Sequence, residues 1–199
     1  MGKYIKRFSQ KDRDVIEILA KCGKASSNQL TSNVDSLKEK RLFNLCREGI
    51  LQKEIIATSR NTNEVCYKLT KEGKNFARDT FNIQSFYKSN GNYHDLILAE
   101  KYLSLTQSER ETWQTETDLQ LQFYKHLDEL KESDRERYDD VLERYESREI
   151  SICDASYISE SGEVIVFEAV TNSYGNREYM AKQAYCQEMK LPDPTYQRL

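Results

Sequence analysis

Two carboxylates near the end of the chain have the surroundings of functional groups. Glu168 lies within the apolar run VIVFEAV, which has the composition of a buried strand. A carboxylate in such surroundings is costly unless it is paired, protonated or bound to a metal ion. Asp154 ends an earlier strand-like run that begins at Ile150, and the segment ISESGE between the two runs suits a hairpin turn. The sequence therefore predicts two acidic groups on adjacent strands.

An Asp at the end of one strand, a hairpin and a Glu in the next strand resemble the metal-binding pair of the PD-(D/E)XK nuclease superfamily. The resemblance implies that Asp154 and Glu168 hold Mg²⁺, which activates water and neutralises charge on the scissile phosphate. It also implies that Glu100, from the preceding helix, joins the metal site. The superfamily usually has a Lys two residues after the Glu, where this chain has Val170. Some members carry the Lys on the following helix, and Lys182 has that place here.

On this resemblance, an active second domain is a Mg²⁺-dependent DNA endonuclease. Its catalytic residues are Asp154, Glu168 and Lys182, with Lys182 near the charge of the transition state, and its metal ligands are Glu100, Asp154 and Glu168. The residues also permit a non-catalytic interpretation, in which Asp154 caps a strand and Glu168 pairs with Lys182 inside the core. In that case the domain is a degenerate nuclease fold that is kept for DNA or protein contacts. Val170, which stands where the superfamily usually has its Lys, favours this interpretation. Nothing in the sequence indicates an organic cofactor.

The elements that position these residues form an α/β domain with a small mixed sheet over residues 93–199. The turn-rich stretch SNGN immediately precedes this α/β domain and separates it from the first domain. A helix is predicted from Asp95 to Leu105, and a last helix, which carries Lys182, from Asn176 to Met189. The segment WQTETDLQL around Trp113 predicts a strand. Residues 124–149 are dominated by charge and predict a solvated helical insertion with few core residues.

The first domain, residues 1–88, begins with apolar residues at helical spacing and then changes period. The predicted starts of its three helices are Ser9 with Asp12 as a capping box, Ser26 or Ser27, and Asp35 or Ser36. Two short strands follow at 50–56 and 64–69, with a polar hairpin tip between them, and a helix then runs toward Phe81. This order resembles the winged helix-turn-helix family. The phrases CREGILQKE and CYKLTKEGKNF carry the resemblance, since they look like the recognition helix, the wing and the exit of bacterial winged-helix regulators.

Basic and amide side chains occur where such a domain would meet DNA. On the third helix, Arg and Lys can reach guanine and an Asn amide can pair with adenine. The hairpin tip suits a backbone or minor groove, the residues before the first helix can neutralise phosphates, and the start of the second helix favours a phosphate. The predicted DNA-binding residues are Lys38, Lys40, Arg41, Asn44, Arg47, Arg60, Asn61, Ser27, Lys6 and Arg7. The alternative is a protein-binding winged helix with a solvated basic face, on which Asn44 is simply exposed.

Charge divides the chain into a basic and an acidic part. Up to Asn92 the chain has 18 Lys and Arg residues and 10 Asp and Glu residues. From Tyr93 onward it has 12 Lys and Arg residues and 23 Asp and Glu residues. The basic part suits a polyanion, which the acidic part repels unless its carboxylates hold metal ions or face elsewhere. The five cysteines form no C-x-x-C pair and predict reduced core residues of a cytoplasmic protein. No window approaches the ~18 apolar residues of a membrane span, so no membrane partner is expected.

The order of the whole chain resembles the plasmid replication-relaxation family, which joins an N-terminal winged helix to a nuclease-like domain. The shared features are the pair His94–Asp95 and a closing strand with Glu168, followed by a Thr and then by a helix with Lys182 and Tyr185. The resemblance covers most of the chain except residues 124–149.

The sequence therefore predicts an α+β protein in which a winged helix-turn-helix precedes a PD-(D/E)XK-like α/β domain. The predicted function is DNA binding by a protein of a mobile element (a plasmid, phage or conjugative element), in replication, transfer or their control. Double-stranded DNA is the expected partner. One alternative is a winged-helix transcription repressor whose C-terminal domain mediates homodimerisation or binds a partner. Another is an interaction protein that uses the acidic module as a DNA mimic or adaptor.

Overall fold

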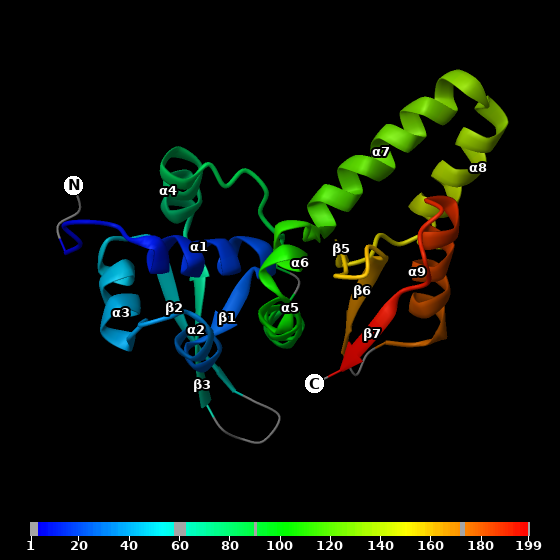
Figure 1. Ribbon diagram of the computed structural model, residues 1–199. Helices are drawn as coiled ribbons and strands as arrows, with labels where there is room; N and C mark the ends of the chain where they lie inside the picture. Colours follow the sequence, from blue (N-terminus) through cyan, green and yellow to red (C-terminus); the bar gives the residue numbers. More distant parts are fainter. Residues whose placement is uncertain (1–3, 58–62, 90, 172–173, 199) are drawn as a thin grey trace. The chain divides into compact units, whose positions relative to one another are not determined.

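The computed structural model describes residues 4–57, 63–89, 91–171 and 174–198 (Figure 1). The chain divides into two compact units, Met1–Leu105 and Thr106–Leu199, each with its own small sheet. Helices and small sheets together confirm the predicted α+β class. Within the described ranges, no helix combines the length and the apolar character needed to cross a membrane. The cysteines are free thiols, in line with the prediction.

The first unit alternates helices and short strands (Figure 1). Its elements are α1 (Gln10–Cys22), β1 (Lys24–Ser26), α2 (Ser27–Asn33), α3 (Glu39–Arg47), β2 (Leu51–Ala57), β3 (Asn63–Leu69), α4 (Lys71–Phe81) and α5 (Asn92–Ser104). Apart from β1, the elements up to α4 follow the predicted order. Apolar side chains of α1, α3 and the sheet form the core, among them Ile16, Leu19, Leu42, Leu45 and Leu51.

Capping residues fix where the first two helices begin. Ser9 caps α1 as predicted, because its backbone N–H donates to the Asp12 carboxylate at 2.6 Å. Ser26 caps α2 through a second capping box. Ser26 Oγ accepts from the backbone N–H of Gln29 at 3.1 Å, and Gln29 Oε1 accepts from the backbone N–H of Ser26 at 2.9 Å. These reciprocal bonds satisfy N–H groups that have no partner inside the helix.

The third helix begins later than the sequence predicted. The expected start was Asp35 or Ser36, but α3 begins at Glu39, and Lys38 is its N-cap. Ser36 has a left-handed backbone with a φ of 54°, and the next residue, Leu37, is buried. The polar pair therefore forms a turn that directs Leu37 into the core, instead of capping the helix.

β3 is the central strand of an antiparallel sheet with the order β1-β3-β2. β2 and β3 form the hairpin predicted at 50–56 and 64–69. β1 was not predicted, because its three residues are too few to show a strand pattern. It brings the buried Lys24 opposite Lys68 on β3, and Glu54 on β2 forms ion pairs with both. The carboxylate thus offsets the repulsion between two neighbouring ammonium groups.

The helix α5 belongs to the first unit, although the sequence assigned it to the second domain. The predicted division lay between residues 88 and 93, whereas the compact units divide after Leu105. Leu96, Ile97 and Leu98 are buried, and α5 packs against α1, β1 and α2. The Gln29 side chain also donates to the backbone carbonyl of Leu96 at 3.0 Å. The linker-like composition before α5 marks a turn within the first unit and not the end of it.

The second unit contains a mixed sheet with the order β4-β5-β6-β7. Its elements are α6 (Gln107–Glu111), β4 (Gln114–Thr115), α7 (Glu116–Ser133), α8 (Arg135–Glu146), β5 (Ala155–Ile158), β6 (Val164–Val170), α9 (Asn176–Glu188) and β7 (Thr195–Arg198). β4, β5 and β6 pair antiparallel, whereas β6 and β7 are parallel. The predicted small mixed sheet and the hairpin at ISESGE, between β5 and β6, are therefore confirmed.

Two predictions for the middle of the chain need correction. Of the expected strand WQTETDLQL, only Gln114–Thr115 form a strand, β4, because Thr115 and Asp118 form a capping box that starts α7 at Glu116. The segment 124–149 is helical as predicted, in α7 and α8, but it contributes more to the core than expected. Its buried apolar side chains pack with those of the sheet and α9 in one cluster, which includes Phe123, Leu127, Leu130, Val141 and Tyr185.

Candidate functional site

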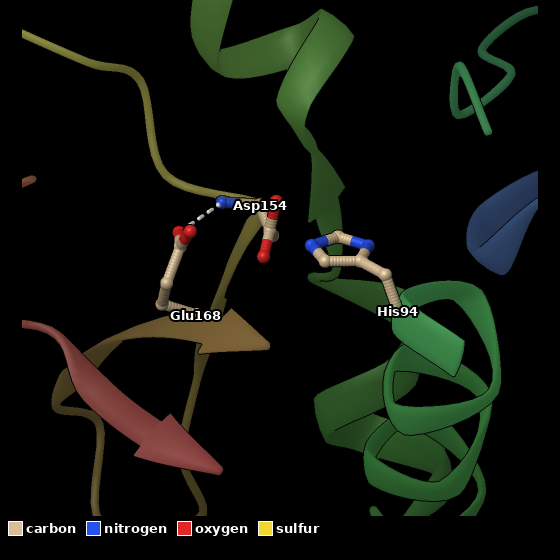
Figure 2. A group of neighbouring side chains, drawn as sticks. All are labelled: His94, Asp154 and Glu168. Carbon is tan, nitrogen blue, oxygen red and sulfur yellow. Dashed lines mark hydrogen bonds between the residues drawn. The ribbon is translucent and has the colours of Figure 1, made fainter. Parts of the chain in front are cut away.

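The hairpin of β5 and β6 brings the two predicted acidic residues together, as Figure 2 shows. Asp154 directly precedes β5, whose first residue, Ala155, pairs with Phe167 on β6. The backbone N–H of Asp154 donates to Glu168 Oε2 at 3.0 Å, and the N–H of Ala169 donates to Asp154 Oδ2 at 2.8 Å. Asp154 is 2% exposed and Glu168 is 1% exposed. The carboxylates are therefore held inside the sheet by its backbone.

Lys182 supplies the positive charge of this cluster from α9. Its Nζ lies 2.8 Å from Glu168 Oε1 and donates to the backbone carbonyl of Ile152 at 2.6 Å. The Tyr174 hydroxyl donates to the same Glu168 oxygen. We call Asp154, Glu168, Lys182 and Tyr174 the acidic cluster. The structure brings together the three residues that the sequence predicted as catalytic, and their catalytic role stays a prediction.

The charges in the acidic cluster follow from burial and proximity. Burial and the charge of Asp154 raise the pKa of Glu168 to about 7, although Lys182 and Tyr174 act in the other direction. Burial lowers the pKa of Lys182, but the carboxylates of Glu168 and Asp154 outweigh it and hold that pKa above its ordinary value. Burial also raises the pKa of Tyr174. At neutral pH, Lys182 is therefore a cation, and Tyr174 is a neutral hydrogen-bond donor.

The two carboxylates lie close enough to share one divalent cation. An oxygen of Asp154 and an oxygen of Glu168 lie within 4.8 Å of each other. Oxygen ligands bind Mg²⁺ or Ca²⁺ at about 2.0–2.6 Å, so an ion between them needs little rearrangement. Glu168 Oε1 already contacts Lys182 and Tyr174. Glu168 Oε2 accepts the N–H of Asp154 among the bonds described and has a second lone pair available for a metal. Glu100, the third predicted ligand, is an exposed residue of α5 in the first unit, and its part in a metal site stays a prediction.

Tyr174 is the member of the acidic cluster that the sequence did not indicate. It lies outside any periodic segment, between β6 and α9, and a lone Tyr in a turn carries no signal for a carboxylate partner. The hydrogen bond from its hydroxyl to Glu168 is therefore known only from the structure.

The first unit has a different surface, on α3. Lys40, Phe43 and Arg47 lie on one side of this helix, and all three are exposed, with Phe43 57% exposed. The guanidinium of Arg47 lies 3.7 Å from the centre of the Tyr4 ring and 5.7 Å from that of Phe43. We call Lys40, Phe43 and Arg47 the α3 face. Phe43 could have been found from the sequence, because it falls outside the stripe of buried leucines on the same helix.

Arg41 takes part in a structural ion pair, and its predicted contact with DNA stays a prediction. Two of its nitrogens donate to the two carboxylate oxygens of Asp12, each at 2.6 Å, and one donates to the carbonyl of Arg7 at 2.9 Å. Asp12 is fully buried, so the pair joins α3 to the start of α1. The sequence showed the basic character of Arg41 but not the acid 29 residues earlier that binds it.

The other predicted DNA-binding residues have varied surroundings. Lys38, Lys6 and Arg7 are exposed, Asn44 is half-buried, and the Ser27 hydroxyl donates to Glu39 at 3.3 Å. Arg60 and Asn61, at the predicted wing tip, lie outside the described residues.

The ion pair of Asp12 gives the first testable prediction. Burial raises the pKa of Asp12, but hydrogen bonds from Arg41 and Ser9 outweigh it and hold that pKa below its ordinary value of 3.8. The stabilisation is therefore fully present above pH 3.8 and is lost as pH falls through the lower pKa of the folded state. We expect Asp12→Asn to reduce the free energy of unfolding by about 3 kcal/mol at pH 7, and by progressively less below pH 3.8.

Urea unfolding of both proteins between pH 2 and pH 7 measures this difference. Asp14→Asn is the matched control, because Asp14 lies on the same helix and accepts only an exposed hydrogen bond from Gln10 among the bonds described. It should change stability by no more than about 0.5 kcal/mol. A loss for Asp12→Asn that stays constant with pH would contradict the role of the charge.

Comparison with known proteins identifies no relative of this chain. No family model matches the chain, and neither a curated protein nor a solved structure does. The fold and the two sites therefore carry the functional argument by themselves.

Proposed function

We propose that this chain is a DNA-binding protein of a mobile element, related to the plasmid replication-relaxation family. Its first unit is a winged helix-turn-helix, and its second unit is a PD-(D/E)XK-like nuclease domain. The α3 face carries the proposal, because exposed Lys40 and Arg47 flank an exposed ring on the helix that would enter the major groove. The order α1, α2, α3, β2, β3 and α4 supports the proposal, because the resemblance to winged helices implies this order.

The chemistry of the α3 face suits the edges and the backbone of duplex DNA. Lys and Arg recognise guanine O6 and N7 or phosphate oxygens, and a Phe ring packs against the methyl group of thymine. The ring of Tyr4 orients the Arg47 guanidinium by a cation–π contact. Arg41 is bound to Asp12, so Lys40 and Arg47 are the cations of α3 on which the proposal depends.

The DNA-binding proposal predicts a specific salt response. The double variant Lys40→Ala/Arg47→Ala is expected to weaken binding to duplex DNA at least tenfold and to reduce the slope of log K against log salt by about 1–2. The control Lys125→Ala/Lys131→Ala removes two exposed cations from α7 and should leave both quantities unchanged. Fluorescence anisotropy from 50 to 300 mM NaCl measures both. If the two double variants have the same affinity for duplex DNA and the same salt slope, α3 does not form the DNA interface.

For the second unit, we propose that the acidic cluster cleaves a phosphodiester. Asp154 and Glu168 would hold Mg²⁺, which supplies a polarised phosphate oxygen and an activated water when bound. Lys182 keeps its charge beside Glu168 and would stabilise the negative charge that develops on the phosphate. Tyr174 and the backbone N–H of Asp154 fix the orientation of the Glu168 carboxylate.

Supercoiled plasmid with Mg²⁺ tests this activity. We expect Asp154→Asn and Glu168→Gln each to reduce nicking about 100-fold or more, because each removes one of the two carboxylates proposed to hold the metal. Glu163→Gln, which changes an exposed acid on the same hairpin, is the control and should cleave normally. Circular dichroism before the assay shows whether each variant is folded. Nicking that persists in both cluster variants would exclude this site.

The alternative function is a transcription repressor whose second unit dimerises or binds a partner. The specific observation in its favour is that Glu168 already has Lys182 and Tyr174 as partners, while Val170 has the usual place of the catalytic Lys. An intact plasmid together with tight, sequence-specific binding would favour this function over cleavage.

A further inference from the structure

A row of three tyrosine rings leads from the acidic cluster to the surface of the second unit. Tyr174, whose hydroxyl donates to Glu168, lies 5.4 Å from Tyr179 between ring centres, at an interplanar angle of 73°. Tyr179 lies 4.7 Å from Tyr196, at 72°. The rings come from the segment before α9, from α9 and from β7, so three separate elements build the row. Glu168 is 1% exposed and Tyr196 is 36% exposed, so the row ends in solvent.

The pairing of β6 with β7 keeps Tyr196, the exposed end of the row, close to the acidic cluster. In this parallel pair, Glu168 lies in register with Tyr196, and Val170 with Arg198. Because side chains alternate along a strand, Tyr196 and Arg198 project from the same face of the sheet as Glu168. The Arg198 guanidinium donates to the Tyr179 hydroxyl at 3.0 Å. An exposed ring and an exposed cation therefore stand together next to the carboxylates.

The charge around this surface contrasts with the acidic character of the unit. Many of its acids lie on α7 and α8, which extend away from the sheet as a helical hairpin (Figure 1). On β7, the exposed cation Arg198 accompanies the rings, whereas Lys182 on α9 is buried beside Glu168. A ligand that combines an aromatic face with negative charge matches this composition, and a nucleotide has both.

We propose that Tyr179, Tyr196 and Arg198 bind a nucleobase of an unpaired DNA strand next to the acidic cluster. This inference rests on the proposed function, and it names the substrate class as single-stranded or locally opened DNA. The exposed ring of Tyr196 stacks on the base, and Arg198 binds the adjoining phosphate. A base within a duplex has both faces covered by its neighbours, whereas an unpaired base can stack on protein rings. The stacking surface tolerates any base, because every base has an aromatic face.

The experiment compares a labelled dT12 oligonucleotide with a 12-unit abasic oligonucleotide, which has the same phosphates but no bases. Binding to the full chain is measured by anisotropy in EDTA, so that no strand is cut. We expect the wild type to bind dT12 about tenfold more tightly than the abasic strand. Contacts through phosphate, including those of the first unit, affect both strands and leave this ratio unchanged.

Variants test whether the preference for dT12 over the abasic strand depends on the tyrosine row. Tyr196→Ala should bring it close to one, and Tyr196→Phe, which keeps the ring, should retain it. Tyr124→Ala removes another exposed tyrosine, on α7, and should retain the ratio as well. Arg198→Ala should weaken binding to both strands and leave most of the ratio. Circular dichroism shows that each variant is folded before binding is compared.

Two results would overturn the inference. A wild-type ratio of one, or a ratio that survives in Tyr196→Ala, would show that this surface binds no base and fits a protein partner better. Binding to duplex DNA in the same assay distinguishes failure of the stacking site from failure of the proposed DNA-binding function. If the wild type binds duplex but has a ratio of one, only the stacking site fails, whereas the loss of all DNA binding also contradicts the proposed function.

Discussion

Replacing Lys182 with methionine is expected to destabilise the second unit by about 3–5 kcal/mol at pH 7. Methionine keeps most of the volume and the apolar contacts of the side chain but removes its charge. Glu168 and Asp154, which are 1% and 2% exposed, then lack the cation that offsets their burial. The backbone carbonyl of Ile152 also loses the ammonium group that donates to it. A buried charge left without its partner is among the costliest single changes in a folded protein.

The double variant Lys182→Met/Glu168→Gln distinguishes charge from packing. It removes the cation and one carboxylate together, so we expect it to recover at least half of the loss. Lys125→Met, an exposed change on α7, is the control and should alter stability by less than about 0.5 kcal/mol. Urea unfolding at pH 7, followed by the fluorescence of Trp113 in the same unit, measures all three. If Lys182→Met alone costs less than about 1 kcal/mol, the acidic cluster is not the desolvated ion pair described here.

Three members of the acidic cluster, Asp154, Glu168 and Lys182, were predictable from the sequence because burial of charge limits the alternatives. A glutamate inside VIVFEAV needs a partner, and the chain between Ile150 and Glu188 offers Lys182 on the helix that follows. The hairpin signal placed Asp154 on the neighbouring strand. These three residues came together through contacts between elements that are close in the sequence, where turn and period signals are strongest.

The parts that could not be predicted depend on contacts between distant segments. The apolar stripe of α5 indicated a buried helix but not which unit would bury it. Arg41 and Lys40 are adjacent and equally basic, yet Asp12 on α1 binds only Arg41. β7 has four residues, too few for a period, and only its pairing with β6 defines it as a strand. The register that places Tyr196 beside Glu168 is therefore a property of the fold.

Gly73→Ala is expected to destabilise the first unit by at least about 3 kcal/mol, although alanine is intrinsically the better helix former. Gly73 lies in the first turn of α4, where alanine would ordinarily gain up to about 1 kcal/mol. A Cβ at this position would stand 2.1 Å from the carbonyl oxygen and 3.0 Å from the carbonyl carbon of Ile50. These are backbone atoms, so no side-chain rotation relieves the overlap, and overpacking of this kind outweighs helix propensity.

The contacts around Gly73 explain why α4 cannot simply move away. The backbone N–H of Thr70 donates to the Ile50 carbonyl at 3.1 Å, and the N–H of Gly73 donates to Thr70 Oγ1 at 2.8 Å. A shift of α4 would therefore break the N-terminal cap of the helix and its link to the start of β2. Gly175→Ala is the matched control, because among the described residues its Cβ would meet the flexible end of Glu178, at 3.2 Å, and it should cost less than about 1 kcal/mol.

Thermal and urea unfolding of both glycine variants measure the difference. If Gly73→Ala and Gly175→Ala lose equal stability, then α4 has room to move from Ile50, and the close approach of the two backbones is not required. A large loss for Gly73→Ala alone would establish that the first helix turn after the β2–β3 hairpin is fixed by backbone contact. In that case the glycine in LTKEG is there because no other residue fits against Ile50, and its weak helix propensity is the smaller of the two opposing effects.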